Sequence, residues 1–231
     1  MRRAAVGVLC VAGAWGALLV AGCARDERTA HQPASPVSQH AIAEARAIPA
    51  SVARGQGDRA PLGFPRGRSE AARLVVEFSD FGCHYCGVFA REVLPIVDRE
   101  FLSTGEVRWR LVPIATASTP HAREAAAAAV CAGQEGEAWA MHDLLFARQR
   151  EWRRFGAPRD AFTRYARELG LDATTFRACL TASATKDTVE AMRVLAQQLG
   201  VRIAPTFFVA GRRVEGALAV DDVRAILRGE R

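Results

Sequence analysis

The order of apolar and polar positions divides the chain into an apolar leader, a polar stretch and a long structured region. Residues 4–22 carry no charge and are mostly Ala, Val, Leu and Gly. Residues 24–58 contain several Pro and Gly and no sustained apolar period, which is typical of a flexible tether. A short helix around residues 41–47 is compatible with the pattern. We therefore expect the folded part to begin near residue 59.

Four strands are predicted where β-branched and aromatic residues gather. They are residues 73–79 and 107–114 and, as a hairpin around Ala210-Gly211, residues 204–209 and 212–215. Between the first two, apolar residues recur at helical spacing, and Pro95 should kink or divide that helix.

Helical patterns fill most of residues 119–200. Their predicted spans run from 119 to 132, 137 to 149, 159 to 169, 174 to 180 and 185 to 199. We expect Thr119 to cap the first with Pro120 in its first turn, and Asp221 or Asp222 to cap a terminal helix. The order of elements predicts an α/β unit interrupted by an α-helical insertion.

Composition and charge narrow the class of protein. A chain of 231 residues, 50% hydrophobic, can bury a core of its own, which excludes a collagen, a low-complexity chain or a polytopic membrane protein. The formal net charge is +6, and Lys186 is the only lysine among 31 basic residues. The arginines are scattered, with no run longer than a pair, so we expect no nucleic-acid partner.

The leader predicts export. Arg2 and Arg3 precede the apolar run, and the run ends at Cys23, a pattern typical of a signal peptide over residues 1–22. The letters VAGC at 20–23 resemble the lipobox of bacterial lipoproteins, which predicts acylation of Cys23 and attachment to a membrane. An uncleaved transmembrane anchor is the alternative, and on either interpretation the remainder is extracytoplasmic.

Four cysteines remain after such processing, in a compartment where disulfides persist. Cys131 and Cys179 lie on predicted helices of the insertion, 48 residues apart. We predict a structural disulfide between them, with two buried free thiols as the alternative. The other two, Cys83 and Cys86, are separated by two residues.

Cys83 and Cys86 follow a predicted strand and open a predicted helix. At a helix N-terminus the free N–H groups and the helix dipole stabilise a thiolate at Cys83. Cys86 is one turn deeper and can close a small ring with it. A protonated His84 would lower the pKa of Cys83 further, and a better-stabilised thiolate makes the corresponding disulfide a stronger oxidant.

Three segments in order resemble the DsbA family of thiol:disulfide oxidoreductases. They are VEFSDFGCHYC at 76–86, EAWAMHDLLF at 137–146 and APTFFVAG at 204–211. The resemblance covers residues 59–231 and implies a thioredoxin-like fold with an inserted α-helical domain at about 118–185.

The resemblance also implies roles for single residues. Cys83 would be the nucleophile and Cys86 the resolving cysteine. Pro205 would be a cis-proline facing them, with the backbone of Ala204 free to pair with an extended substrate. Glu77 matches the buried acid of the family and would relay a proton for Cys86. The alternative for Glu77 is an edge position from which its side chain points to solvent.

The resemblance implies a disulfide oxidase for unfolded exported proteins, recharged by a quinone-linked membrane partner. Many oxidases of the family have Pro-His between the cysteines, whereas His84-Tyr85 stands here, and a tyrosine before the second cysteine also occurs in bacterial disulfide isomerases. Isomerase and thioredoxin-like reductase therefore stay open as alternatives. We expect a monomer that needs no cofactor beyond its own disulfide.

The non-enzymatic alternative is a module that binds copper or zinc through Cys83, His84 and Cys86. We do not expect one, because no methionine-rich copper site is visible. His121 and His142 are interpreted as structural, and Trp139 belongs to an apolar stripe with His142.

Overall fold

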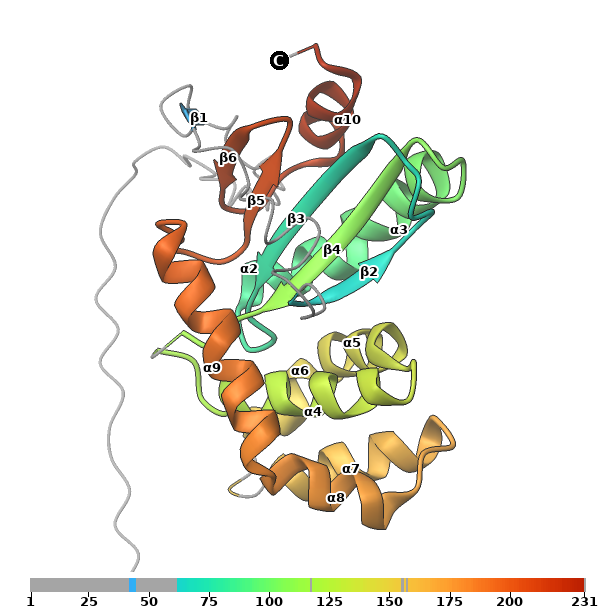
Figure 1. Cartoon of the computed structure of the whole chain (residues 1–231), viewed down its shortest axis with the longest axis vertical. Helices are drawn as coiled ribbons and strands as arrows, with labels where there is room; N and C mark the ends of the chain where they lie inside the picture. The colour runs from blue at the N-terminus through green and yellow to red at the C-terminus, as the bar shows by residue number, and fades with distance from the viewer. Residues whose placement is uncertain (1–41, 45–61, 117, 155, 157, 231) are drawn as a thin grey trace, which may run out of the picture. The chain divides into compact units, whose positions relative to one another are not determined.

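The computed structural model describes residues 42–44, 62–116, 118–154, 156 and 158–230. The predicted leader, Cys23 and most of the predicted tether lie outside them. The described strands form one sheet in the order β1-β6-β5-β3-β4-β2, shown in Figure 1. They are β1 (Ile42–Glu44), β2 (Phe64–Arg66), β3 (Arg73–Ser79), β4 (Val107–Pro113), β5 (Thr206–Val209) and β6 (Arg212–Glu215). β3 and β4 are parallel, and the other neighbours are antiparallel.

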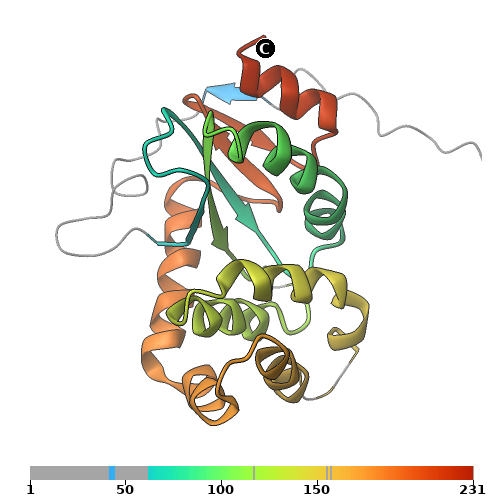
Figure 2. The same cartoon turned by 90° about the vertical axis from the view of Figure 1, so that its right-hand side faces the viewer.

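Two groups of helices accompany the sheet. One group connects β3 to β4 or follows β6: α2 (His84–Val88), η2 (Phe89–Val93), α3 (Leu94–Val97), η3 (Asp98–Leu102) and α10 (Val220–Arg228). The other lies between β4 and β5: α4 (Ala122–Gln134), α5 (Ala138–Ala147), α6 (Gln149–Trp152), α7 (Pro158–Glu168), α8 (Ala173–Thr181) and α9 (Ser183–Gln198). Figures 1 and 2 show α4 to α8 gathered beyond one end of the sheet, with α9 returning to β5. The predicted α/β fold of thioredoxin type with inserted helices is confirmed.

Side chains of β3 alternate between two apolar clusters, as the twofold period of a strand requires. Val75 belongs to the cluster with Phe89 and the residues of α10. Val76 and Phe78 belong to the cluster with α4, α9 and the inserted helices. Glu77 lies on the same side of the strand as Val75, so it is directed into an apolar layer.

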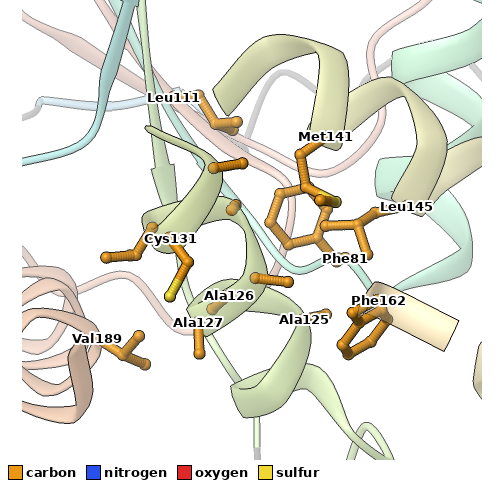
Figure 3. Packing of buried hydrophobic residues seen from close by; sticks show 14 of the residues in the cluster. Phe81, Leu111, Ala125, Ala126, Ala127, Cys131, Met141, Leu145, Phe162 and Val189 are labelled. Carbon is orange, nitrogen blue, oxygen red and sulfur yellow. The ribbon is translucent and has the colours of Figure 1, made fainter. Parts of the chain in front are cut away.

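The inserted helices share one core with the end of the sheet. Figure 3 shows Leu111 of β4, Met141 of α5, Phe162 of α7 and Val189 of α9 around the alanine-rich helix α4. The alanines of α4 are buried and small, which lets these helices approach it closely. Phe81, two residues before Cys83, is 1% exposed in this core. The turn before the cysteine pair is therefore anchored in the insertion.

A disulfide joins α4 to α8 inside the insertion. Cys131 and Cys179 have an S–S distance of 2.06 Å and a Cα–Cα distance of 5.8 Å. Cys131 is 3% exposed, so the bond lies at the edge of the core. The two sulfurs join helices that are 48 residues apart in sequence.

Two strands differ from the sequence predictions. The short helix that the pattern allowed around residues 41–47 does not form at residues 42–44, which make β1 and pair with β6, with Ile42 opposite Val214. β2 was not predicted at all. It pairs with β4 through its backbone, and its Pro65 carbonyl accepts a hydrogen bond from Trp139 Nε1 of α5 at 2.8 Å. Both strands depend on partners far away in the chain.

Two helix starts also differ. α4 begins at Ala122, with His121 at its N-cap in a left-handed conformation (φ 59°), so Thr119 is not the cap. The Thr119 hydroxyl instead bonds Thr116 Oγ1 at 2.7 Å. α10 begins at Val220 without a side-chain cap, and its two aspartates lie within the first turn. There they complement the positive end of the helix dipole.

Candidate active site

The cysteine pair occupies the junction between β3 and the first helix. Cys83 is the N-cap of α2, with φ −73° and ψ 130°, and Cys86 lies within the first turn. Cys86 is fully buried, whereas Cys83 is partly exposed, and both are free thiols. One sulfur is thus accessible to another molecule and the other is protected behind it.

The turn before Cys83 is held by a buried aspartate that the sequence analysis did not single out. Asp80 accepts hydrogen bonds from Gly82 N at 2.8 Å, Thr116 N at 2.9 Å and Thr116 Oγ1 at 2.6 Å. Gly82 is needed for close approach, because a Cβ there would lie 1.8 Å from Thr119 Cγ2. An aspartate one position after a strand and two before a glycine is a turn signal that could have identified it.

Gln149, at the start of α6, supports the same turn from the insertion. Its Nε2 donates to the carbonyl of Phe81 at 2.6 Å and to that of Cys83 at 2.7 Å. Gln149 is 5% exposed, so these two bonds are shielded from water. It lies 66 residues beyond Cys83 in sequence, and no local pattern marks it.

The surroundings of Cys83 favour its thiolate. A hydrogen bond from the Cys86 thiol, followed by backbone N–H groups of Tyr85 and Cys86, outweighs partial burial and lowers the pKa of Cys83 to about 6. A thiol with this pKa is largely ionised at neutral pH, and the thiolate is the nucleophilic form. The expected lowering of the Cys83 pKa by His84 is not found.

Cys86 is tuned in the opposite direction. Burial raises its pKa, and the neighbouring Cys83 raises it further. The backbone N–H of Asp80 donates to Cys86 Sγ at 3.4 Å. The pair therefore divides into a thiolate at the surface and a protonated thiol inside, which is the arrangement that dithiol–disulfide exchange requires.

A loop from the other end of the chain faces the accessible sulfur. The Ala204–Pro205 peptide bond is cis, and Cys83 Sγ lies 3.3 Å from the carbonyl oxygen of Ala204, to which it donates in its protonated form. Tyr85 and Ile203 are 62% and 46% exposed, large apolar side chains on either side of this contact. The predicted loop and the cysteine pair thus lie together, although 121 residues separate Cys83 from Ala204.

Glu77 is fully buried and does not point to solvent. Its Oε2 accepts a hydrogen bond from Trp109 Nε1 at 2.9 Å, while Oε1 has no hydrogen-bond partner among the described residues. Desolvation raises the pKa of this carboxyl, and the charge of His142 opposes the shift. Ser79 Oγ, two residues further along the same strand, is also buried and has no hydrogen-bond partner among the described residues.

His142 and Trp152 are packed in the core. His142 is buried, packs against Trp139 and Phe146 with ring centroids 4.9 Å apart, and bonds Asp143 through Nδ1. Trp152 is buried and donates to a backbone carbonyl of α5. Within the described residues, no group of three or more His, Cys, Asp or Glu side chains is placed to hold a metal ion. None of the described helices is both long and apolar enough to cross a membrane.

These features together define a protein of thioredoxin fold with an asymmetric cysteine pair that faces a cis-proline loop. A comparison with family models then assigns the chain: the model described as thioredoxin matches residues 61–228. The chain belongs to the thioredoxin family.

Similar solved structures share this architecture. BdbD from Bacillus subtilis superposes with a TM-score of 0.67 at 22% identity, over 73% of this chain and 92% of that one. α-DsbA1 from Wolbachia pipientis gives 0.66 at 17% identity, over 74% and 92%. A thioredoxin-like oxidoreductase from Silicibacter pomeroyi gives 0.61 at 28% identity, over 73% and 92%.

Curated relatives carry two kinds of name. A protein of Salinispora tropica named Na(+)/H(+) antiporter NhaA 3 is 38% identical over 162 residues, which is 69% of this chain but only 23% of that protein. Disulfide bond formation protein D of Bacillus subtilis is 23% identical over 191 residues, covering 76% of this chain and 83% of that protein. The chain thus spans about a quarter of the antiporter-named relative and most of the other.

Proposed function

We propose that this chain is an exported disulfide oxidase that introduces disulfides into unfolded proteins outside the cytoplasm. The observation that carries the proposal is the asymmetry of the cysteine pair. Cys83 is accessible and its pKa is lowered to about 6, while Cys86 is buried and its pKa is raised. An environment that stabilises the dithiol form makes the disulfide form an oxidant.

The reaction is a pair of exchanges at Cys83. A substrate thiolate attacks Cys83 Sγ of the Cys83–Cys86 disulfide, a mixed disulfide forms, and Cys86 leaves as a thiolate that takes up a proton. A second substrate thiolate then attacks the substrate sulfur, the substrate disulfide forms, and Cys83 leaves as a stabilised thiolate. Two electrons pass from the substrate to the pair in each cycle.

Neighbouring groups assist these steps. The Ala204–Pro205 loop lies beside Cys83, where its backbone would pair with an extended substrate segment. Glu77 would deliver a proton to Cys86 as it leaves, since its buried carboxyl has a raised pKa and lies on the strand that leads to the cysteine pair. A quinone-linked membrane partner would reoxidise the pair. The chain works as a monomer and uses no cofactor beyond this disulfide.

The reduction potential of the Cys83–Cys86 pair tests the direction of electron flow. We expect a value near the −120 mV of a strong oxidant such as DsbA, and a value near about −270 mV would make the chain a reductase. Cys86→Ser should trap substrates as mixed disulfides, and Cys83→Ser should abolish exchange. Rapid reshuffling of wrong disulfides would indicate an isomerase, and stoichiometric metal retained on purification would indicate a metal-binding module.

We further propose that Cys23, outside the described residues, is acylated and holds the protein to a membrane. Each buried CH₂ of an acyl chain contributes about 0.8 kcal/mol to membrane binding. Cys23→Ser should therefore move the exported protein from the membrane fraction to the soluble fraction while exchange activity persists. Unchanged membrane retention of this variant would instead support an uncleaved apolar anchor.

A further inference from the structure

A basic cavity lies beside the start of α2, the helix that Cys83 caps. Its volume is about 500 Å³, and it is formed between the start of α2 and the segment from α5 to α6. The charged and titratable residues that line it are His84, Arg91, Arg148, Arg150, Glu151 and Arg153. Cations thus outnumber the single carboxylate of the lining.

The cavity is joined to the active-site turn by hydrogen bonds. Gln149 lines it and donates to the carbonyl of Cys83 at 2.7 Å. His84, the residue that follows the nucleophile, also lines it and is exposed. A substrate whose sulfur reaches Cys83 therefore passes close to this cavity.

The positive charge of the cavity is only partly neutralised. Glu151 pairs outward with Arg164 at 3.1 Å, and Arg148 makes two hydrogen bonds with Glu168. Arg150 and Arg153 are exposed and have no ion pair with any described residue.

In a second large cavity, of about 620 Å³, the positive charge of the lining is neutralised differently. Two of the three arginines that line it, Arg123 and Arg193, both pair with Glu190, and the third, Arg202, is exposed. The cavity that His84 lines differs in holding two arginines, Arg150 and Arg153, without an ion pair to any described residue.

We infer that this cavity is a docking subsite for acidic residues that flank the reactive cysteine of a substrate protein. The inference rests on the proposed function and deepens it. Guanidinium groups bind carboxylates through paired N–H donors, and a fixed positive site beside the nucleophile raises the rate at which acidic segments associate. The subsite therefore selects substrates by the charge near their cysteines.

Three dithiol peptides that differ only in the residues beside their cysteines (Glu, Gln or Arg) test this inference. The second-order rate at which the disulfide form oxidises each peptide is measured at low and at physiological salt. Exposed ion pairs contribute about 0.2–1 kcal/mol each, so two arginines should favour the Glu peptide over the Gln peptide by about two- to thirtyfold at low salt. The preference should shrink as salt screens the charges.

A double variant tests the assignment to these arginines. Arg150→Gln with Arg153→Gln should remove the preference for the Glu peptide and leave oxidation of the Gln peptide unchanged. Arg159→Gln with Arg167→Gln is the matched control, because it removes two exposed arginines of α7 and the same net charge. This control should retain the preference.

The outcomes separate the inference from the proposed function. Equal rates for the three peptides, or a preference that persists in the Arg150/Arg153 variant, would overturn the subsite while leaving the oxidase intact. Failure to oxidise any of the peptides would overturn the proposed function and the subsite with it.

Discussion

At the scale of residues, two thiols three positions apart have opposite acidities because their environments differ. Cys83 lies at the end of a helix, where it accepts hydrogen bonds from the Cys86 thiol and from backbone N–H groups. Cys86 is buried in an apolar core, where charge is disfavoured. The helix start and the depth of one turn are visible in the sequence, but the degree of burial depends on the packing of the whole domain.

Glu77 gives a prediction about stability. Desolvation raises the pKa of this carboxyl, so its contribution to stability is fully present below its unfolded pKa and is lost as pH rises above that value. Glu77→Gln should therefore stabilise the protein at neutral pH, by about 1–3 kcal/mol, because the amide that replaces the carboxyl has no charge to desolvate. Urea unfolding of both proteins measures this difference.

The pH dependence provides the control for Glu77→Gln. The two proteins should converge in stability at acid pH, where the carboxyl of Glu77 is protonated even in the unfolded chain. A variant that is less stable than the parent at neutral pH would show that the carboxylate is stabilising there.

At the scale of elements, the helix after the cysteines accommodates Pro95 by switching between α-helical and π-helical turns. The π-helical turns η2 and η3 flank α3, and Pro95 lies at the start of α3, where its missing N–H is tolerated. The helix was predicted to kink or divide at Pro95, and in the structure π-helical turns lie on both sides of that position. Pro95 indicates in the sequence where the helix changes. Phe89 and Phe101 pack in one apolar cluster, which holds the segment on one face of the sheet.

The bond between α4 and α8 gives a prediction for the insertion. Cys131→Ala with Cys179→Ala removes a cross-link that closes a loop of 48 residues. Because such a cross-link restricts the unfolded chain, its loss should cost about 2–4 kcal/mol of unfolding free energy. Denaturant unfolding of the oxidised parent and the variant measures the loss.

Exchange at Cys83 should survive in the Cys131→Ala, Cys179→Ala variant, because neither sulfur touches the active pair. The reduction potential of Cys83–Cys86 is the check. A potential that moves strongly with the second disulfide would mean that the insertion controls the active pair through more than the position of Gln149.

At the scale of the whole molecule, the active site is assembled from three distant parts of the chain. The strand β3 and helix α2 present the sulfurs, the loop before β5 brings Ala204 to 3.3 Å from Cys83, and the insertion contributes Gln149. This assembly links the oxidation state of the pair to the stability of the entire fold.

The stability of the dithiol form relative to the disulfide form should therefore depend on pH. The folded pKa of Cys83 is lowered to about 6, so its thiolate stabilises the folded dithiol form above the unfolded pKa. That stabilisation is lost as pH falls through about 6. We expect the unfolding temperature of the dithiol form to fall relative to the disulfide form between about pH 8 and pH 5.

Thermal unfolding of the two forms across this range measures the effect. Cys83→Ser has no thiol at this position to ionise, so it should lack this part of the pH dependence. A constant difference between the dithiol and disulfide forms would contradict a stabilised thiolate at Cys83.

The sequence by itself determined the elements and the chemistry of the pair. Periodic apolar positions specify β3, β4, the inserted helices and the hairpin, because their patterns are local. The spacing of Cys83 and Cys86 after a strand specifies a redox pair for the same reason. The order of these elements was sufficient to predict the fold class.

Only the tertiary structure decided which distant groups meet. β1 and β2 form because the edges of the sheet offer backbone partners. No short apolar pattern in the sequence indicates where such an edge will lie. Gln149 and Trp109 bond to Cys83 and Glu77 across 66 and 32 residues of sequence. Such contacts arise when the packing of separate elements brings polar groups together away from water, and each buried donor or acceptor then requires a partner.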